Sequence, residues 1–280
     1  MSSLETYSAN QVKKYDYDRF LITLFAQADL REDLFALYAF NHEVAKIREA
    51  VSEPMLGEIR LQWWREAIEG IIEQKPRNHE VVLPLNDTFH KHELSSEIFI
   101  KVIDARSADI YGENPKTIED FEEYLGATSG NLMKIAAHIC GERDEEVLSL
   151  AYDLGLVWGL IGTMRAIRYH ISLGKLSLPQ DLMDEFGVTK RDIMGMESGE
   201  NIKNLIQALS VSAQNHLDQI KADKKLLSKH VKPIFLLSSL SRSYLAMIKK
   251  ADYDPFSINE KASMFPRQSR LFFSALFGFL

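Results

Sequence analysis

The sequence predicts an all-α fold, and three observations lead to that prediction. Apolar residues recur at spacings of three and four along most of the 280 residues, which is the period of an amphipathic helix. Strict alternation of apolar and polar residues, which is typical of strands, is nearly absent. The eight prolines fall mostly between the periodic segments or at their starts, where helices tolerate them. No linker or internal repeat divides the chain, so we expect a single domain over residues 1–280.

The first half of the chain contains four predicted helices. Apolar faces at helical spacing lie within residues 30–47, 61–71 and 99–110. A fourth helix begins after Thr117, because a threonine followed three residues later by Asp120 is typical of an N-terminal cap.

The second half continues the same pattern. A short helix over residues 132–139 can end at Gly141, and a long helix runs from residue 145 to about residue 172. Two more apolar faces, over residues 202–220 and 234–248, complete the predicted bundle.

Charge and composition exclude several classes of protein. With 33 Lys+Arg against 40 Asp+Glu, the formal net charge of −7 argues against nucleic-acid binding, which needs a concentrated basic surface. The single cysteine, Cys140, excludes a disulfide framework and any cysteine-based metal site within one chain. Two histidines in segment 89–93 are two residues apart and would diverge on a helix, so we expect a solvated loop there.

The two ends of the chain bear on its location. Residues 1–20 are polar and charged, so we expect no secretory signal, and no apolar run reaches the roughly 18–20 residues that span a bilayer. Residues 271–280, Leu-Phe-Phe-Ser-Ala-Leu-Phe-Gly-Phe-Leu, are nevertheless very apolar. They predict either a terminal helix that completes the bundle or a peripheral contact with a membrane.

The long helix carries a stripe of small residues. Ala151, Gly155, Gly159 and Gly162 recur at spacings of four, four and three. A glycine inside a helix costs about 0.5–1 kcal/mol relative to alanine, so the stripe needs a physical reason. Either a neighbouring helix approaches closely, or the stripe forms a groove wall that admits a long ligand.

Two short segments carry a resemblance to a known family. Residues 37–40, Leu-Tyr-Ala-Phe, and residues 174–182, Gly-Lys-Leu-Ser-Leu-Pro-Gln-Asp-Leu, resemble segments of the squalene/phytoene synthase family. The similarity covers nearly the whole chain. It implies a single-domain helical bundle of the isoprenoid synthase type with a central groove.

The chemistry of that family implies what its metal site must contain. Head-to-head prenyl transfer ionises an allylic diphosphate, and Mg²⁺ held by two aspartate-rich motifs neutralises the departing pyrophosphate. At the positions of those aspartates this sequence has Ala45, Lys46, Glu49, Ala166 and His170. Only Glu49 keeps a carboxylate. The resemblance therefore implies no metal site, no cofactor and no catalytic residue, with Mg²⁺ expected only if an altered site is still active.

Four basic residues are candidates to contact a diphosphate or another anion directly: Lys46, Arg165, Arg168 and Lys175. Those at the end of the long helix are also typical of a solvated C-terminus, where the helix dipole favours cations. For Lys46, the alternative to a position facing the groove is a surface ion pair with a neighbouring glutamate.

Three further segments narrow the resemblance to one branch of the family. Residues 39–53, 60–67 and 249–256 resemble the complex I assembly factor 6 group and its alphaproteobacterial relatives. This implies a helper in assembling respiratory complex I (NADH:ubiquinone oxidoreductase), with complex I subunits, assembly intermediates or a prenyl lipid as partners. The alternatives are an isoprenoid-diphosphate transferase with an altered metal site and a non-catalytic prenyl-lipid binder.

The branch also implies a location. We expect the cytoplasm of a bacterium, with or without contact with the inner membrane, or the mitochondrial matrix for a mature eukaryotic form.

Overall fold

The computed structural model describes residues 5–112, 114–174, 176–259 and 264–277, and every regular element in these ranges is a helix. The all-α prediction is confirmed. Through the first half of the chain the elements are α1 (Tyr7–Tyr15), α2 (Tyr17–Thr23), α3 (Arg31–Ala45), α4 (Ile47–Ala50), α5 (Pro54–Ile72), α6 (Val82–His92), α7 (Ser96–Ala105), α8 (Ser107–Tyr111), α9 (Ile118–Leu125), the π-helix η1 (Gly126–Gly130) and α10 (Asn131–Ile139). They are followed by α11 (Glu145–Ser172), α12 (Gln180–Glu185), α13 (Lys190–Met194), α14 (Glu200–Ala222), the 3₁₀-helix η2 (Lys224–Leu226), α15 (Lys232–Lys250) and α16 (Met264–Phe277).

The cap predicted from the sequence is present at the start of α9. The Thr117 hydroxyl accepts a hydrogen bond from the backbone N–H of Asp120, and the Asp120 carboxylate accepts one from the backbone N–H of Thr117. This reciprocal pair satisfies two N–H groups that a helix start otherwise leaves without partners.

The loop expected over residues 89–93 is a wrong prediction, because residues up to His92 belong to α6. Two tertiary contacts hold this end of the helix. The Phe89 ring lies 4.6 Å from the Phe99 ring between centroids, and His92 Nε2 lies 2.8 Å from an oxygen of Asp33.

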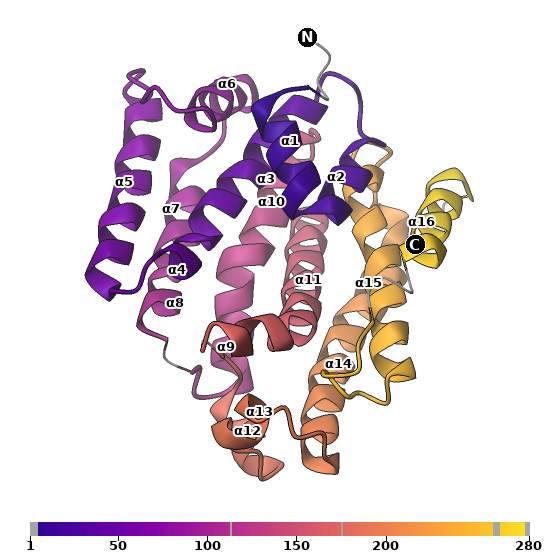
Figure 1. Cartoon of the computed structure of the whole chain (residues 1–280). Coiled ribbons are helices and arrows are strands. Elements are labelled where there is room, and N and C mark those ends of the chain that lie inside the picture. The colour runs from indigo at the N-terminus through magenta and orange to yellow at the C-terminus, as the bar shows by residue number, and fades with distance from the viewer. Residues whose placement is uncertain (1–4, 113, 175, 260–263, 278–280) are drawn as a thin grey trace.

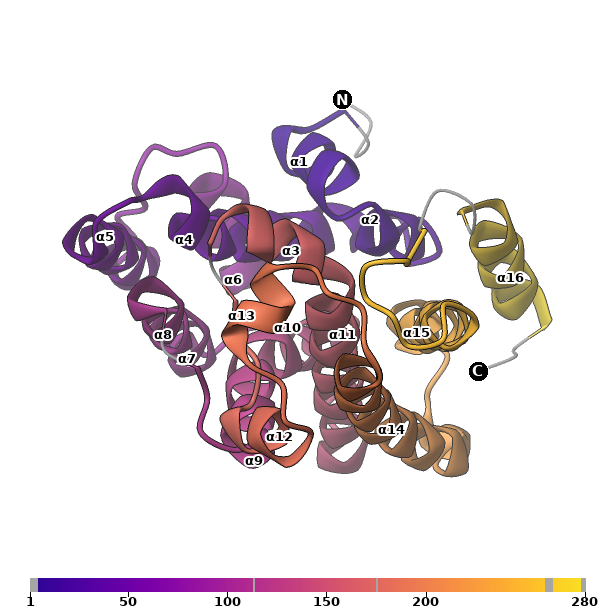
Figure 2. The same cartoon turned by 60° about the horizontal axis from the view of Figure 1, so that its bottom comes forward.

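Helix α11 is the central element of the bundle. It contacts α10, η1, α14 and α15, and Figures 1 and 2 show it surrounded by them. One 18-residue window of α11 has a mean hydropathy of 1.5, so the helix is long and apolar enough to cross a membrane, contrary to the expectation from the sequence. Because 67% of that window is buried inside the fold, its apolar composition serves the core.

The core is continuous from one end of the chain to the other. One cluster of buried apolar side chains extends from Ala9 to Leu271. That the chain forms a single domain over residues 1–280 remains a prediction, and the continuous core supports it.

The C-terminal segment is helical where the structure describes it. Residues 271–277 belong to α16, which packs on α15 and buries Leu271 and Ser274. This agrees with the interpretation of a terminal helix packed on the bundle. Residues 278–280 lie outside the described part of the chain.

Glycines bring the backbones of α11 and η1 into contact. A Cβ added to Gly155 would lie 2.1 Å from the carbonyl oxygen of Ser129 and 2.6 Å from the Cα of Gly130. A Cβ added to Gly162 would have no neighbour within 4 Å. The stripe on α11 thus changes character along its length, from close helix packing to open space.

We expect Gly155→Ala to lower the free energy of unfolding by at least about 1–3 kcal/mol, because its methyl group meets backbone that cannot swing aside. Gly162→Ala is the matched control. It should leave stability unchanged or raise it by up to about 1 kcal/mol, because alanine favours the helix. Denaturant unfolding followed by far-ultraviolet circular dichroism measures both variants, and equal effects would contradict the close contact.

Candidate functional site

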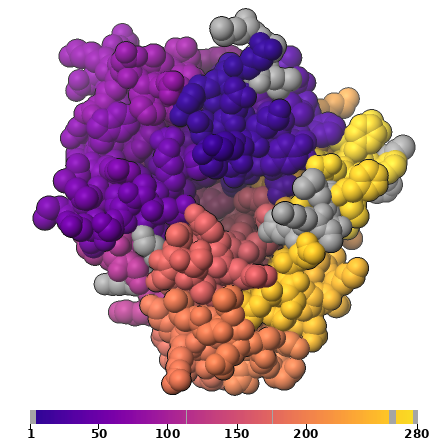
Figure 3. Space-filling model, in the orientation of Figure 1, coloured from indigo at the N-terminus to yellow at the C-terminus, as the bar shows by residue number. Residues whose placement is uncertain are grey.

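A cavity of about 280 Å³ opens between α3, α4, η1 and α11, and we call it the groove cavity. Figure 3 shows the surface hollowed near the centre of this face, between the N-terminal helices and the residues that follow α11. The residues expected in a groove that line this cavity are Ala45, Glu49, Gly159, Gly162, Ala166 and His170. The structure therefore brings together four of the five positions at which the resemblance places aspartates.

The fifth of those positions, Lys46, does not line the groove cavity. Its ammonium group pairs with the carboxylate of Glu43, one turn back along α3. Of the small-residue stripe, Ala151 and Gly155 are buried in the core instead of lining the cavity.

The basic residues expected to contact an anion are also not brought together. Arg168 is exposed and donates a hydrogen bond of 3.0 Å to the backbone carbonyl of Phe256. Arg165 lines a different cavity, and Lys175 lies outside the described residues.

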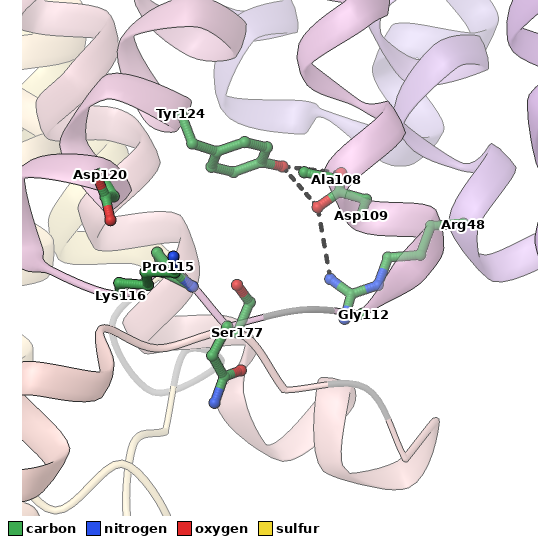
Figure 4. A pocket seen from close by; sticks show the side chains of 10 residues that line it. Arg48, Ala108, Asp109, Gly112, Pro115, Lys116, Asp120, Tyr124 and Ser177 are labelled. Carbon is green, nitrogen blue, oxygen red and sulfur yellow. Dashed lines mark hydrogen bonds and ion pairs between the residues drawn. The ribbon is translucent and has the colours of Figure 1, made fainter.

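A cluster of ion pairs closes one side of the groove cavity, and we call it the Asp109 cluster. It comprises Arg48, Arg106, Asp109 and Tyr124, of which Figure 4 shows Arg48, Asp109 and Tyr124. Arg106 Nη1 donates to the Tyr124 hydroxyl at 2.8 Å and lies 3.2 Å from Asp109 Oδ2, while Arg48 Nη1 lies 3.7 Å from Asp109 Oδ1. The Tyr124 hydroxyl donates to the Asp109 carboxylate at 2.8 Å.

Burial sets the protonation states in this cluster. It raises the pKa of the Tyr124 hydroxyl, so the phenol stays neutral and acts as a donor. Desolvation alone would lower the pKa of Arg106, but Tyr124 and Asp109 together raise it. Two guanidinium groups therefore face one carboxylate, which leaves this wall with an excess of positive charge.

The Asp109 cluster also borders a second hollow. Arg48, Asp109 and Tyr124 line a neighbouring cavity of about 390 Å³, which Lys116 and Ser177 complete (Figure 4). The same three side chains thus separate the two cavities.

The remaining carboxylate of the expected metal positions is already engaged. Glu49 accepts a hydrogen bond of 2.7 Å from the hydroxyl of Tyr169. Beside it, burial and then the charge of Arg48 lower the pKa of His170, which favours a neutral imidazole at pH 7.

Arg165 belongs to a third cavity of about 450 Å³ on the other side of Trp158. Its guanidinium carbon lies 3.7 Å from the centroid of the Tyr244 ring, and that of Arg267 lies 4.3 Å from the same ring. The Tyr244 hydroxyl donates to Asp18 at 2.6 Å. Burial raises the pKa of Asp18, and the Tyr244 bond and Arg165 partly oppose that shift.

The family follows from comparison with known proteins. A profile of squalene/phytoene synthases matches residues 12–273. The chain belongs to the squalene/phytoene synthase family. In its sequence it is similar to the human NADH dehydrogenase (ubiquinone) complex I assembly factor 6, with 28% identity over 93% of this chain and 79% of that protein.

Two other similarities lie within the same family. A presqualene diphosphate synthase of Sinorhizobium fredii is 26% identical over 167 residues, which is 58% of each chain. A crystal structure of a dehydrosqualene synthase with a bound ligand has a TM-score of 0.85 and 19% identity, and the match covers 98% of this chain and 96% of that one. This likeness confirms the predicted fold of the squalene/phytoene synthases.

The Mg²⁺ of squalene/phytoene synthases can be tested against the donor set of the groove cavity. Mg²⁺ prefers several oxygen ligands in an octahedral arrangement. Ala45 and Ala166 offer none, and a neutral His170 offers nitrogen. Of the two carboxylates, Glu49 accepts a hydrogen bond from Tyr169 and Asp109 is compensated by its arginines. Within the described residues no group of three or more histidines, cysteines and acids could hold a metal ion. This donor set does not fit Mg²⁺.

Sequence reasoning missed the charged residues that dominate the groove cavity. Arg19, Arg48, Arg106 and Asp109 all line it. One local signal was available, because Arg106 and Asp109 stand three residues apart, as an ion pair within a helix requires. The pairing of Arg48 with Asp109 spans 61 residues, so periodicity could not reveal it.

We expect Asp109→Ala to lower the free energy of unfolding by up to about 3–5 kcal/mol, because it removes the shared carboxylate of two guanidinium side chains that are only 11% and 18% exposed. Asp104→Ala is the matched control, since Asp104 is 54% exposed and pairs with Arg65 at the surface. Asp104→Ala should lower the free energy of unfolding by at most about 1 kcal/mol. Thermal or denaturant unfolding compares the two variants. Equal losses of unfolding free energy would show that the Asp109 cluster is no more shielded from solvent than the surface pair.

We expect the protein to lose stability as the pH falls from 7.5 to 5.5. A histidine whose pKa is lowered in the folded state binds fewer protons there than in the unfolded state, so acid favours unfolding. His170→Gln should make the loss smaller, whereas His90→Gln, at an exposed position, should leave it unchanged. Unfolding midpoints measured across this pH range test the difference. If the midpoint of His170→Gln fell with pH as steeply as that of the intact chain, His170 would not be the source of the acid sensitivity.

Proposed function

We propose that this protein assists the assembly of respiratory complex I and does not catalyse prenyl transfer. Similarity to complex I assembly factor 6 over 93% of the chain supports the first part. The second part rests on the groove cavity, where alanines and a histidine stand at the metal positions of the family.

The charges of the groove cavity carry this proposal. Arg19, Arg48 and Arg106 line it together with two carboxylates, Glu49 and Asp109. Arg19 is also paired with Asp16 at 2.7 Å, so the excess of positive charge comes from Arg48 and Arg106, which share Asp109. Like charges about 4 Å apart repel by about 4 kcal/mol at an effective dielectric constant of 20, and a divalent cation is repelled more strongly. Such a wall favours an anionic group and disfavours the metal that would ionise an allylic diphosphate.

The positions expected to bind an anion are revised accordingly. In this proposal Arg48 and Arg106 take the place of Lys46 and Arg168 as cations of the groove, because they line it and the other two point elsewhere. Gly162 leaves room for an apolar chain beside Trp158, whereas Gly159 packs against the side chain of Leu125. A prenyl lipid held without turnover is compatible with this arrangement.

The second candidate function is an isoprenoid-diphosphate transferase with an altered site. The similarity to a presqualene diphosphate synthase over 58% of the chain favours it, as do the groove arginines, which could balance part of a diphosphate's charge. In that case Mg²⁺ would need ligands from the diphosphate and water instead of the family's aspartates.

Deletion of the gene in the source organism tests the assembly role. We expect assembled complex I to fall several-fold, with succinate dehydrogenase unchanged, because an assembly factor acts on one enzyme. Blue-native electrophoresis with in-gel NADH dehydrogenase activity measures this, and re-expression of the intact chain should restore it. A normal level of complex I in the deletion strain would overturn the assembly role.

A turnover assay separates the two candidates. The purified protein is incubated with farnesyl or geranylgeranyl diphosphate and Mg²⁺, and the extract is searched for a condensed C30 or C40 product. We expect none above a heat-inactivated control. Product that disappears in the presence of a chelator would establish the transferase and refute the non-catalytic assignment.

A further inference from the structure

Helix α16 has one face packed against the bundle. Arg267, Leu271 and Ser274, spaced by four and three residues, are buried, and the hydroxyl of Ser274 lies 2.7 Å from that of Ser239 on α15. Figures 1 and 2 both place α16 at the edge of the molecule beside α15. The remaining faces of the helix point away from the core.

The outward face of α16 is strongly apolar. Phe265 is 79% exposed, Phe272 53%, Phe273 55% and Leu276 60%. Four large apolar side chains on one short helix exceed the scattered exposure that is normal at a protein surface. Such a face marks a site of contact with another apolar surface, that of a protein or a membrane.

The surroundings of this face are basic, although the protein carries a net charge of −7. Residues 264–277 contain no acidic residue, and Arg270 is exposed, whereas Arg267 is buried against the bundle. Beside the C-terminal half of α16, Lys229 and Lys232 line a hollow of about 240 Å³ together with Ser274 and Ala275. Over residues 221–232 the sequence has five lysines and one aspartate.

We propose that α16 docks this protein on the surface of a membrane that contains anionic lipids. The outward phenylalanines and leucine would enter the boundary between headgroups and acyl chains, and Lys229, Lys232 and Arg270 would lie at the level of the lipid phosphates. Apolar side chains flanked by cations are the combination that binds such a surface. This inference is independent of the proposed function.

A second copy of this chain is a less suitable occupant of the same face. A two-fold dimer through α16 would place the lysines of one copy near the corresponding lysines of the other, because such an interface uses the same patch twice. Like charges brought together in this way oppose association. An anionic lipid surface relieves the repulsion instead.

Vesicle flotation tests the proposal with point variants, because Leu271 and Ser274 are buried and removal of α16 would disturb the fold. The intact chain should float with vesicles of phosphatidylcholine mixed with phosphatidylglycerol and much less with phosphatidylcholine alone. In the triple variant Phe272→Ser, Phe273→Ser, Leu276→Ser, partition should fall more than about tenfold.

Two further variants of the chain complete the experiment. The double variant Met55→Ser, Ile59→Ser removes exposed apolar side chains from α5 and should bind vesicles as the intact chain does. The double variant Lys229→Glu, Lys232→Glu should lose about fivefold in binding per lysine, and only on the anionic vesicles. Circular dichroism confirms that each variant is folded.

Three results would overturn the proposal. The first is an intact chain that does not float with anionic vesicles. The second is a folded triple serine variant, or a folded Lys229→Glu, Lys232→Glu variant, that binds the anionic vesicles as well as the intact chain does. The third is light scattering that shows a dimer for the intact chain and a monomer for the triple variant, without vesicle binding, which would assign the face to a second copy.

Discussion

The contact between α11 and η1 is the constraint on which the candidate site depends. Because Gly155 has no side chain, the backbone of α11 rests directly on Ser129 and Gly130. That contact fixes the rotation of α11 about its own axis. Farther along the helix, the rotation directs Trp158, Gly162 and His170 into the groove cavity. A larger residue at position 155 would therefore displace all three of these residues together, and not a single side chain.

Much of the fold could be predicted because helices leave a local signal. Apolar spacing located α3, α5, α11, α14 and α15, since burying one face of a helix requires that spacing wherever the helix lies. The end of α6 left no such signal. Contacts with Phe99 of α7 and Asp33 of α3 stabilise this end of α6, and both residues belong to other helices.

The candidate site could be predicted only in part, for a reason of geometry. Successive residues of an α-helix point about 100° apart, so a one-residue step decides which cavity a side chain enters. Ala45 therefore faces the groove whereas Lys46 does not, and Ala166 faces it whereas Arg165 faces the cavity beyond Trp158. The ion pair that joins α4 to α8 and the hydrogen bond that joins α9 to α8 depend on tertiary packing, which no spacing along the chain encodes.

The Asp109 cluster also bears on how this chain could change over evolutionary time. A carboxylate introduced at position 45 or 166 would enter a cavity that already holds Arg19, Arg48 and Arg106. These arginines already have carboxylate partners and would be shared between them and the new one, so the first effect of such a substitution would be a further ion pair and not a place for a divalent cation. A Mg²⁺ site in this cavity would need changes at the arginines as well. Each of those changes alone would leave Asp109, whose side chain is 10% exposed, with less compensation, so the separate changes are individually unfavourable.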